Sequence, residues 1–531
     1  PQQVMQQQMG FAADHFALWH RMSARMLGKP YTPYIDASPK DRRFKDAAWN
    51  DSTIFDFIKQ SYLINAQWLE RAVGSVKGLD SHMQRKVNFF ARQLIDALSP
   101  SNFLMFNPEV MRTTLETNGD NLVKGLENLL GDLARGDGKL RISMTDERAF
   151  ELGKNIASTP GKVVFENDLM QLIQYAPSTD TVHEVPLLVI PAWINKYYVL
   201  DLTEGNSLVR WLVAQGYTVF MVSWVNPDEE LGRKRFDDYL REGPLKALDV
   251  IADITKTDRC SIMGYCLGGT LTAILLSYLR AQGQEKRVAS ATYLTTMIDF
   301  TDAGDLSVFI DDLQLDALED RMSERGYLDA YDMATTFNML RANDLIWSFV
   351  VNNYLLGKDP FPFDLLYWNS DSTRMPATMH SFYLRNMYQQ NKLVQPGGIE
   401  LLGVPINLSK ITTPTYVLST REDHIAPWQS TYAATQIYDG PVTFTLAESG
   451  HIAGVINPPS KKKYGYYSNA ALPPKPEAWL AGAKEVRDSW WGHWDTWQQT
   501  YAGKRVKARK IGSAKYKPRE DAPGSYARVK A

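Results

Sequence analysis

The chain has 531 residues, 44% of them hydrophobic, and a formal net charge of −2 at pH 7. This length predicts more than one folded unit, and the balanced charge excludes a whole-molecule attraction to nucleic acid or to a membrane surface. Only two cysteines are present, which excludes a disulfide scaffold and favours a reducing, cytoplasmic environment. We find no signal-peptide pattern and no apolar run of roughly 18 residues, so no transmembrane segment is expected.

Charge is nevertheless unevenly distributed along the chain. Residues 501–531 contain ten lysines and arginines but only Glu520 and Asp521 as acidic residues. We therefore define a basic tail at about 502–531. A solvated segment is the ordinary interpretation of such a tail, and a specific anion-binding element is the alternative.

Helical spacing dominates residues 1–158. Apolar side chains recur three and four positions apart, as in Ile54, Phe55, Ile58 and Tyr62. This region predicts a helical N-terminal domain, and we find no group of catalytic residue types in it.

Residues 159–531 predict a single α/β catalytic domain, because short apolar runs alternate with amphipathic stretches from about residue 160 onward. Helices of this length between strands indicate parallel pairing with right-handed crossovers. The expected strands are 186–194, 217–224, 259–263, 289–296, 414–419 and 442–446, and the expected intervening helices are 206–215, 236–254 and 267–282.

The alternation stops between about 305 and 385, in a stretch rich in aspartate, leucine, methionine and aromatic residues. We interpret this stretch as a cap insertion over the carboxyl edge of the sheet, where open α/β sheets bind their ligands.

The segment Gly264-Tyr265-Cys266-Leu267-Gly268 has the form G-x-C-x-G and joins a predicted strand to a predicted helix. In an α/β hydrolase this position is a sharp turn that lifts a nucleophile above the sheet. The helix that follows favours a thiolate at Cys266, and the backbone N–H of Leu267 is placed to bind an oxyanion. A buried cysteine with no catalytic role is the alternative, and we assign that role to Cys260.

A nucleophile at such a turn needs a histidine that follows the last strand. His451 lies in a loop after the strand 442–446, and we predict that it is the general base. His424 lies in an earlier loop, and we place it in the substrate channel or cap. The remaining histidines lie outside these two loops, at positions 15, 20, 82, 183, 380 and 493.

Asp423 follows the strand 414–419, which is the usual position of the acid that orients the histidine. Its rivals are the adjacent Glu422 and two residues after an earlier strand, Asp299 and Asp302. For the second oxyanion donor we select the backbone N–H of Ile194 in Pro191-Ala192-Trp193-Ile194, although an ordinary strand-to-loop transition explains that segment as well.

These segments together resemble the polyhydroxyalkanoate synthase family, and the likeness runs from about residue 90 to 500. The motifs that carry it are Gly264–Gly269, Glu422–Trp428, Gly450–Pro459, Ile194–Tyr198 and Tyr367–Asp371. The long N-terminal region and the Tyr-Cys-Leu-Gly-Gly-Thr form of the box resemble the class I enzymes in particular.

The resemblance implies an α/β-hydrolase fold with a mainly parallel sheet, a cap insertion and a helical N-terminal domain. It implies polymerisation of (R)-3-hydroxyacyl-CoA, with 3-hydroxybutyryl-CoA as the expected monomer, through a covalent acyl-cysteine. It also implies a homodimer at the surface of polyhydroxyalkanoate granules in the cytoplasm, together with granule-associated proteins such as phasins. Trp368 is expected in the channel or cap or at a dimer contact, although ordinary buried aromatic packing explains it as well. Neither a metal nor a cofactor beyond the coenzyme A thioester substrate is expected.

Two other functions remain open from the sequence. One is a cysteine-dependent hydrolase of the dienelactone-hydrolase type, which would release free acids to water. The other is an inactive granule-binding protein that retains the fold. An intact cysteine, aspartate and histidine in the order that the fold requires argues against the inactive form.

Overall fold

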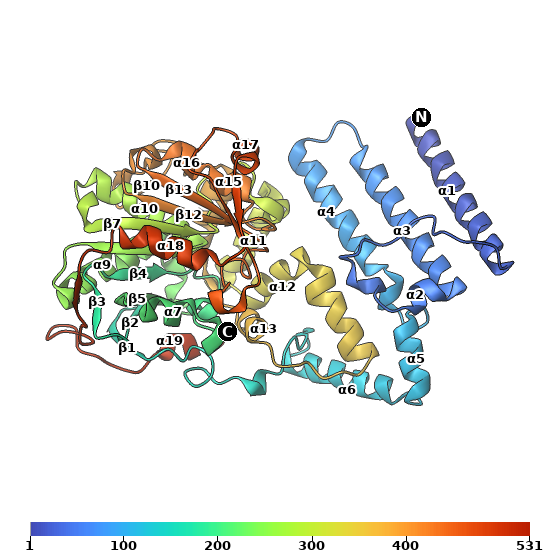
Figure 1. Cartoon of the computed structure of the whole chain (residues 1–531), viewed down its shortest axis with the longest axis horizontal. Coiled ribbons are helices and arrows are strands. Elements are labelled where there is room, and N and C mark those ends of the chain that lie inside the picture. The colour runs from blue at the N-terminus through green and yellow to red at the C-terminus, as the bar shows by residue number, and fades with distance from the viewer. Residues whose placement is uncertain (1) are drawn as a thin grey trace. The chain divides into compact units, whose positions relative to one another are not determined.

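The computed structural model describes residues 2–531, with side chains from residue 7 onward. The chain forms two compact units (Figure 1), of which the first contains residues 1–146 and 335–362. The second contains residues 147–334 and 363–531. Two separate stretches of chain therefore form the first unit. The second stretch, residues 335–362, lies inside the segment 305–385 that interrupts the α/β alternation.

The first unit is helical, and several large hydrophobic side chains of its helices are exposed, among them Phe16, Trp19 and Leu115. Its helices are α1 (Gln2–Met26), α2 (Ala48–Asp51), α3 (Thr53–Gly74), α4 (Ser81–Ala97), α5 (Pro108–Glu116) and α6 (Asp120–Arg135), joined by most of α12 (Ala330–Leu340) and by the short helices Asn343–Trp347 and Val350–Leu355. Side chains cap several of these helices: Asp80 accepts from Met83 N at the start of α4, and Asn107 accepts from two amides at the start of α5.

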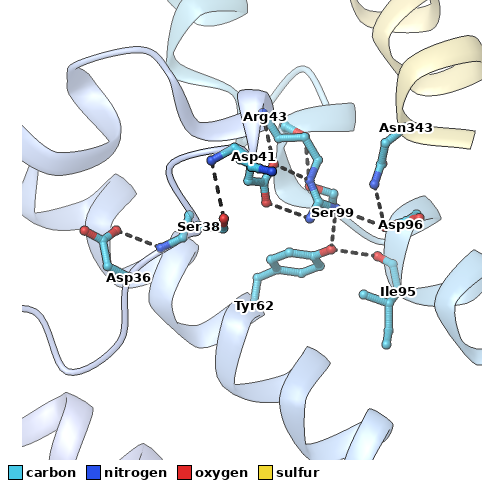
Figure 2. Close-up of polar contacts among 12 residues, drawn as sticks. Asp36, Ser38, Asp41, Arg43, Tyr62, Ile95, Asp96, Ser99 and Asn343 are labelled. Carbon is cyan, nitrogen blue, oxygen red and sulfur yellow. Dashed lines mark hydrogen bonds and ion pairs between the residues drawn. The ribbon is translucent and has the colours of Figure 1, made fainter. Parts of the chain in front are cut away.

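A polar network centred on Arg43 lies beside the core of this unit (Figure 2). The Arg43 guanidinium donates to Asp41, to Tyr62 Oη at 2.8 Å and to Asp96 Oδ1 at 3.2 Å. Asn343 donates to the same Asp96 oxygen at 2.7 Å, which ties residues 335–362 to α4. The network thus links three sections of chain that are distant in sequence.

The second unit is built on a ten-stranded sheet of order β1-β2-β5-β4-β6-β7-β12-β13-β14-β15. Its central strands, from β5 to β13 in that order, pair in parallel, and two antiparallel strands extend each edge. The strands are β1 (Gly161–Glu166), β2 (Met170–Tyr175), β4 (Leu187–Ile190), β5 (Val219–Trp224), β6 (Cys260–Tyr265), β7 (Val288–Leu294), β12 (Thr415–Thr420), β13 (Val442–Ala447), β14 (Tyr466–Ser468) and β15 (Lys484–Val486).

The parallel strands and the helices between them lie where the sequence predicts them. β4, β6 and β7 are buried along their whole length, as expected for strands covered on both faces. The connecting helices are α7 (Leu208–Ala214), α8 (Phe236–Leu240), α9 (Lys246–Thr255), α10 (Leu267–Ala281), α15 (Trp428–Tyr432) and α16 (Ala434–Ile437). The expectation of a mainly parallel sheet with a helical N-terminal region is therefore confirmed.

Residues 304–334 and 363–391 of the second unit are mostly helical. They contain α11 (Asp312–Arg325), the start of α12, α13 (Asp364–Ser370), α14 (Ala377–Tyr383), the short helix Leu384–Gln389, and the two-residue strands β8 (Tyr327–Leu328) and β9 (Met375–Pro376). A further two-residue pair, β10 (Glu400–Leu401) and β11 (Val404–Pro405), follows.

The C-terminal segments pack against the second unit. Helix α18 (Trp490–Gln499, red in Figure 1) reaches the sheet through Trp494, which donates to Thr292 Oγ1, and through Gln498, which donates to Ser261 Oγ. Helix α17 (Pro476–Ala481) precedes α18. In the basic tail, β16 (Arg505–Lys507) pairs with β3 (Thr181–His183), and α19 (Ser525–Arg528) follows. No helix in the described part of the chain has both the length and the apolar character needed to cross a membrane.

Candidate active site

Cys266 lies at the sharp turn between β6 and α10. Its backbone has φ 52° and ψ −119°, a conformation that residues with a side chain rarely adopt. Such strain persists where the surrounding structure enforces it, and it concentrates at functional positions. The cysteine is half-buried.

Two glycines allow this turn to pack closely. A Cβ at Gly268 would lie 1.9 Å from the carbonyl oxygen of Ile190, at the end of β4. A Cβ at Gly264 would lie 2.5 Å from the Cα of Gly269. Both contacts are with backbone that has no room to move, so the first turn of α10 packs directly against the end of β4 and the loop that follows it.

His451 faces Asp423 from the loop that follows β13. Its Nδ1 lies 2.7 Å from Oδ2 of Asp423, and the Asp423 side chain is fully buried. Burial lowers the pKa of His451, but charge and hydrogen-bonding interactions with Asp423 and Cys266 outweigh that effect and raise the pKa to about 10. The structure thus brings together Cys266, His451 and Asp423, in the chain order that the sequence predicts.

The carboxylate of Asp423 is held on both oxygens. Oδ1 accepts from the backbone N–H groups of Ile425 and Ala426, each at 2.9 Å, while Oδ2 also accepts from Thr420 Oγ1 at 3.3 Å. These hydrogen bonds fix the orientation of the Asp423 carboxylate toward His451. Among the rivals, Glu422 is exposed, and Asp299 accepts from Thr301 and Asn391 instead.

The other cysteine and three other histidines have different environments. Cys260 is buried, and burial raises its pKa to about 12, so it is protonated at neutral pH. Burial lowers the pKa of His380 to about 4, and it also lowers the pKa values of His183 and His493. These three imidazoles are therefore neutral at pH 7.

The loop after β4 contains Ile194, which is partly buried. Trp368 and Tyr265 are buried in one core cluster, and Cys266 packs against that cluster. The indole N–H of Trp368 donates to the carbonyl of Lys196 at 2.7 Å. His424 is partly buried beside Asp423, and its backbone carbonyl accepts from Asp305 N at 2.9 Å. Trp368 therefore contacts the loop after β4, and His424 contacts the segment that follows β7.

Two tyrosines near Cys266 were not predicted from the sequence. Burial raises the pKa values of Tyr383 and Tyr388, and the charge of Cys266 contributes to both shifts. Their rings lie 5.4 Å apart, and each approaches the ring of Phe300. The aromatic richness of residues 305–385 is a general sequence signal that does not single out Tyr383, and Tyr388 lies beyond that segment.

This arrangement suits nucleophilic acyl transfer. A thiol at a strained turn, an imidazole that can take its proton and a buried carboxylate that fixes the imidazole are the parts that such chemistry requires. The N-terminal end of α10 adds amide groups that favour negative charge at the reacting centre.

Comparison with known proteins gives the family. Residues 40–212 match the family described as the poly-beta-hydroxybutyrate polymerase (PhaC) N-terminus, and residues 185–458 match the alpha/beta hydrolase fold. The chain is 49% identical to a poly(3-hydroxyalkanoate) polymerase of Methylorubrum extorquens, over all of this chain and 88% of that protein. It is 48% identical to the polymerase subunit of Rhizobium meliloti and 43% identical to that of Cupriavidus necator, again over all of this chain and over 86% and 89% of those proteins. The chain therefore belongs to the poly(3-hydroxyalkanoate) polymerase family of acyltransferases and has the α/β-hydrolase fold.

Proposed function

We propose that this polymerase joins (R)-3-hydroxyacyl units from their coenzyme A thioesters through an acyl-cysteine on Cys266, with 3-hydroxybutyryl-CoA as the expected monomer. The observation that carries the proposal is the position of Cys266 at a strained turn beside His451, whose pKa its charge and hydrogen bond help to raise. The Nδ1 of His451 lies 2.7 Å from Oδ2 of Asp423. The first step is attack of the Cys266 sulfur on the thioester carbonyl after His451 has taken the thiol proton. The N–H groups of Leu267 and Ile194 would bind the resulting oxyanion.

The same groups then complete the reaction. Collapse of the tetrahedral species breaks the bond to coenzyme A, whose thiolate leaves with the proton that His451 carries. One thioester has replaced another, so the acyl group stays activated. A 3-hydroxyl group then gives its proton to His451 and attacks the acyl-cysteine, which forms an ester and frees Cys266.

Asp423 is proposed to orient His451 and stabilise its protonated form. Its carboxylate is fully buried, and both oxygens already accept hydrogen bonds from His451, Thr420 and backbone amides. Direct deprotonation of the substrate hydroxyl would require one oxygen to exchange a partner for substrate. The orienting role needs no such change.

Water must be excluded, because hydrolysis of the acyl-cysteine would end the chain. We propose that a cap formed within residues 305–385 performs this role and that Trp368 and His424 border the channel beneath it. The support is an aromatic group in and beside this segment: Phe300 and Tyr383 are buried, Tyr388 is partly buried, and the charge of Cys266 contributes to the raised pKa of both tyrosines. We also propose residues 1–158 as a helical N-terminal domain in addition to the catalytic domain 159–531, with residues 335–362 of the latter packed in the helical unit.

The chemistry of the product suggests the setting. A water-insoluble polyester would keep the enzyme at the polymer surface, so we propose a cytoplasmic protein at the surface of polyhydroxyalkanoate granules. A homodimer and contacts with granule-associated proteins such as phasins are part of this proposal.

Purified protein with 3-hydroxybutyryl-CoA tests the proposal when free coenzyme A and insoluble polyester are both followed. We expect both products from the parent protein and neither from Cys266→Ala, while Cys260→Ser retains turnover. Release of coenzyme A with only monomeric acid would favour a hydrolase. Absence of turnover in the parent would favour a binding protein, and full activity of Cys266→Ala would remove the mechanism.

A further inference from the structure

Two loop segments that include motifs of the family resemblance, Ile194–Tyr198 and Tyr367–Asp371, lie against each other in the second unit. One follows β4 and contains Trp193 to Tyr198, and the other contains Trp368 to Thr373. Thr373 Oγ1 donates to the carbonyl oxygen of Trp193 at 2.7 Å, and Tyr198 Oη donates to Asp371 Oδ2 at 2.7 Å. Between these contacts, Asn195 and Ser372 form an antiparallel bridge.

The Thr373 contact fixes one particular peptide group. In a planar trans peptide the C=O and the N–H point in opposite directions, so a hydroxyl that holds the Trp193 carbonyl also sets the direction of the Ile194 N–H. Trp193 and Thr373 are each only 2% exposed, so water does not compete for this bond. Within the described residues, no hydrogen bond from the Ile194 N–H is found.

Side chains hold the same loop at two other points. Trp224 Nε1 donates to the carbonyl of Pro191 at 2.9 Å, and Trp368 Nε1 donates to that of Lys196 at 2.7 Å. The absence of a side chain at Gly268 lets the loop's first residues pack against the turn that contains Cys266 and Leu267. Side chains thus hold three carbonyls of this loop, while the Ile194 N–H has no hydrogen-bond partner among the described residues.

We propose that Thr373 is a positioning residue, whose hydroxyl holds the Trp193–Ile194 peptide so that the Ile194 N–H meets the thioester oxygen when Cys266 attacks. This inference rests on the proposed function, since it concerns the oxyanion of the same acyl transfer. Thr373 does not touch the reacting atoms. It acts through the peptide that it holds.

The test compares two reactions of Cys266 in the purified full chain. Release of the first equivalent of coenzyme A from 3-hydroxybutyryl-CoA requires the oxyanion donors, whereas alkylation by iodoacetamide requires only the thiolate. In Thr373→Val, which keeps the branched shape but removes the donor, we expect coenzyme A release to slow roughly 10- to 100-fold with little change in KM. Alkylation should stay within about twofold of the parent rate, and Thr373→Ser should restore most of the coenzyme A release.

Thr255→Val is the matched control, because Thr255 Oγ1 also donates to a buried carbonyl, that of Ile251 at 2.7 Å. Its coenzyme A release should equal that of the parent. Parent-like release in Thr373→Val, equal losses of release and alkylation, or the same loss in Thr255→Val would each overturn the inference. If Thr373→Val does not fold, Trp368→Phe removes another donor to the loop. This variant should also slow coenzyme A release without slowing alkylation. Turnover by Cys266→Ala would refute the proposed acyl-cysteine function itself. That result is distinct from those that would overturn only the role of Thr373.

Discussion

The indole N–H of Trp491 lies 3.0 Å from the carbonyl oxygen of Val455, four residues after His451 in the chain. The preceding residue, Trp490, donates to the carbonyl of Gly454 at 3.0 Å, and both tryptophans are buried. Helix α18 therefore holds the loop that contains the candidate base, much as Trp224 and Trp368 hold the loop that contains Ile194.

Trp491→Phe should destabilise the second unit. The substitution removes a donor from a buried carbonyl and leaves space where the larger ring packed, so we expect a loss of about 1–3 kcal/mol in the free energy of unfolding. Chemical denaturation measures it. Trp19→Phe is the control, because Trp19 is 60% exposed and its replacement should change stability by less than about 0.5 kcal/mol. Equal stability of the two variants would show that α18 does not secure this loop.

Asp423→Asn should lower the pKa of His451. Burial alone lowers that pKa, and the Asp423 charge is the largest of the effects that raise it to about 10. The variant should therefore hold the imidazole neutral at pH 7, with coenzyme A release reduced by at least roughly 100-fold because the protonated imidazole loses its partner. The pH dependence of Cys266 alkylation, with Asp299→Asn as the control, measures the change. An unchanged profile would show that Asp423 does not govern His451.

The same pair predicts how stability depends on pH. A histidine whose pKa is raised in the folded state stabilises the fold fully below its unfolded pKa of about 6.5, and this stabilisation is lost as pH rises through the folded pKa of about 10. The stability advantage of the parent over Asp423→Asn should therefore be largest near pH 6, on the order of 3 kcal/mol, and shrink toward pH 10. Urea denaturation across this range tests the sign. A constant advantage would contradict the coupling.

Gly268→Ala should prevent the turn at Cys266 from forming. The added Cβ would lie 1.9 Å from the carbonyl oxygen of Ile190, which cannot move without breaking β4 from its neighbours. We expect a loss of more than about 3 kcal/mol or insoluble protein, with no coenzyme A release. Gly131→Ala in α6 is the control: a Cβ there meets nothing within 4 Å, so the variant should be about 0.5–1 kcal/mol more stable. A soluble, active Gly268→Ala protein would contradict the geometry.

The sequence predicts the centre of the second unit better than its edges. β4, β6 and β7 are apolar runs followed by helices, and the turn at Cys266 has its own glycine pattern. Strand β2, which lies next to the edge strand β1, contains Gln171 and Gln174, and the sequence pattern predicts no strand there. Both are buried because the tail covers them: Gln171 donates to Glu520 and Ser525, and Gln174 donates to the carbonyl of Lys510. A partner more than 300 residues away leaves no trace in local periodicity.

The same limit applies to the candidate site. Cys266, Asp423 and His451 could be brought together from the sequence, because strand ends in a parallel sheet meet at one edge and the fold fixes their order. The bond between Thr373 and Trp193 spans 180 residues and depends on how residues 363–391 pack. The closeness of Tyr383 and Tyr388 to Cys266 has the same origin. Motifs can show that a segment matters without showing which backbone group its side chains hold.

Because Arg43 belongs to a largely buried network, its loss should destabilise the first unit more than the loss of Arg112, which forms a surface ion pair. Arg43→Met leaves Asp96 buried with Asn343 but without the guanidinium, and we expect a loss of about 3–5 kcal/mol at pH 7.5. Arg112→Met removes an ion pair with Asp46 in which the arginine is about half exposed, so solvent screening should limit the loss to about 0–1 kcal/mol. Denaturant unfolding of the two variants of the full chain measures both values.

The effect of pH separates a charge effect from lost packing at Arg43. Burial is the largest cause of the raised pKa of Asp96, and loss of Arg43 should raise that pKa further. A carboxyl group whose folded pKa is raised favours the folded state at low pH, and this advantage is lost as pH rises through the folded pKa. The deficit of Arg43→Met should therefore be smaller at pH 5 than at pH 7.5. A deficit that is the same at both pH values would mean that the arginine acts by packing over the rings of Phe44 and Tyr62, and not through its charge on Asp96.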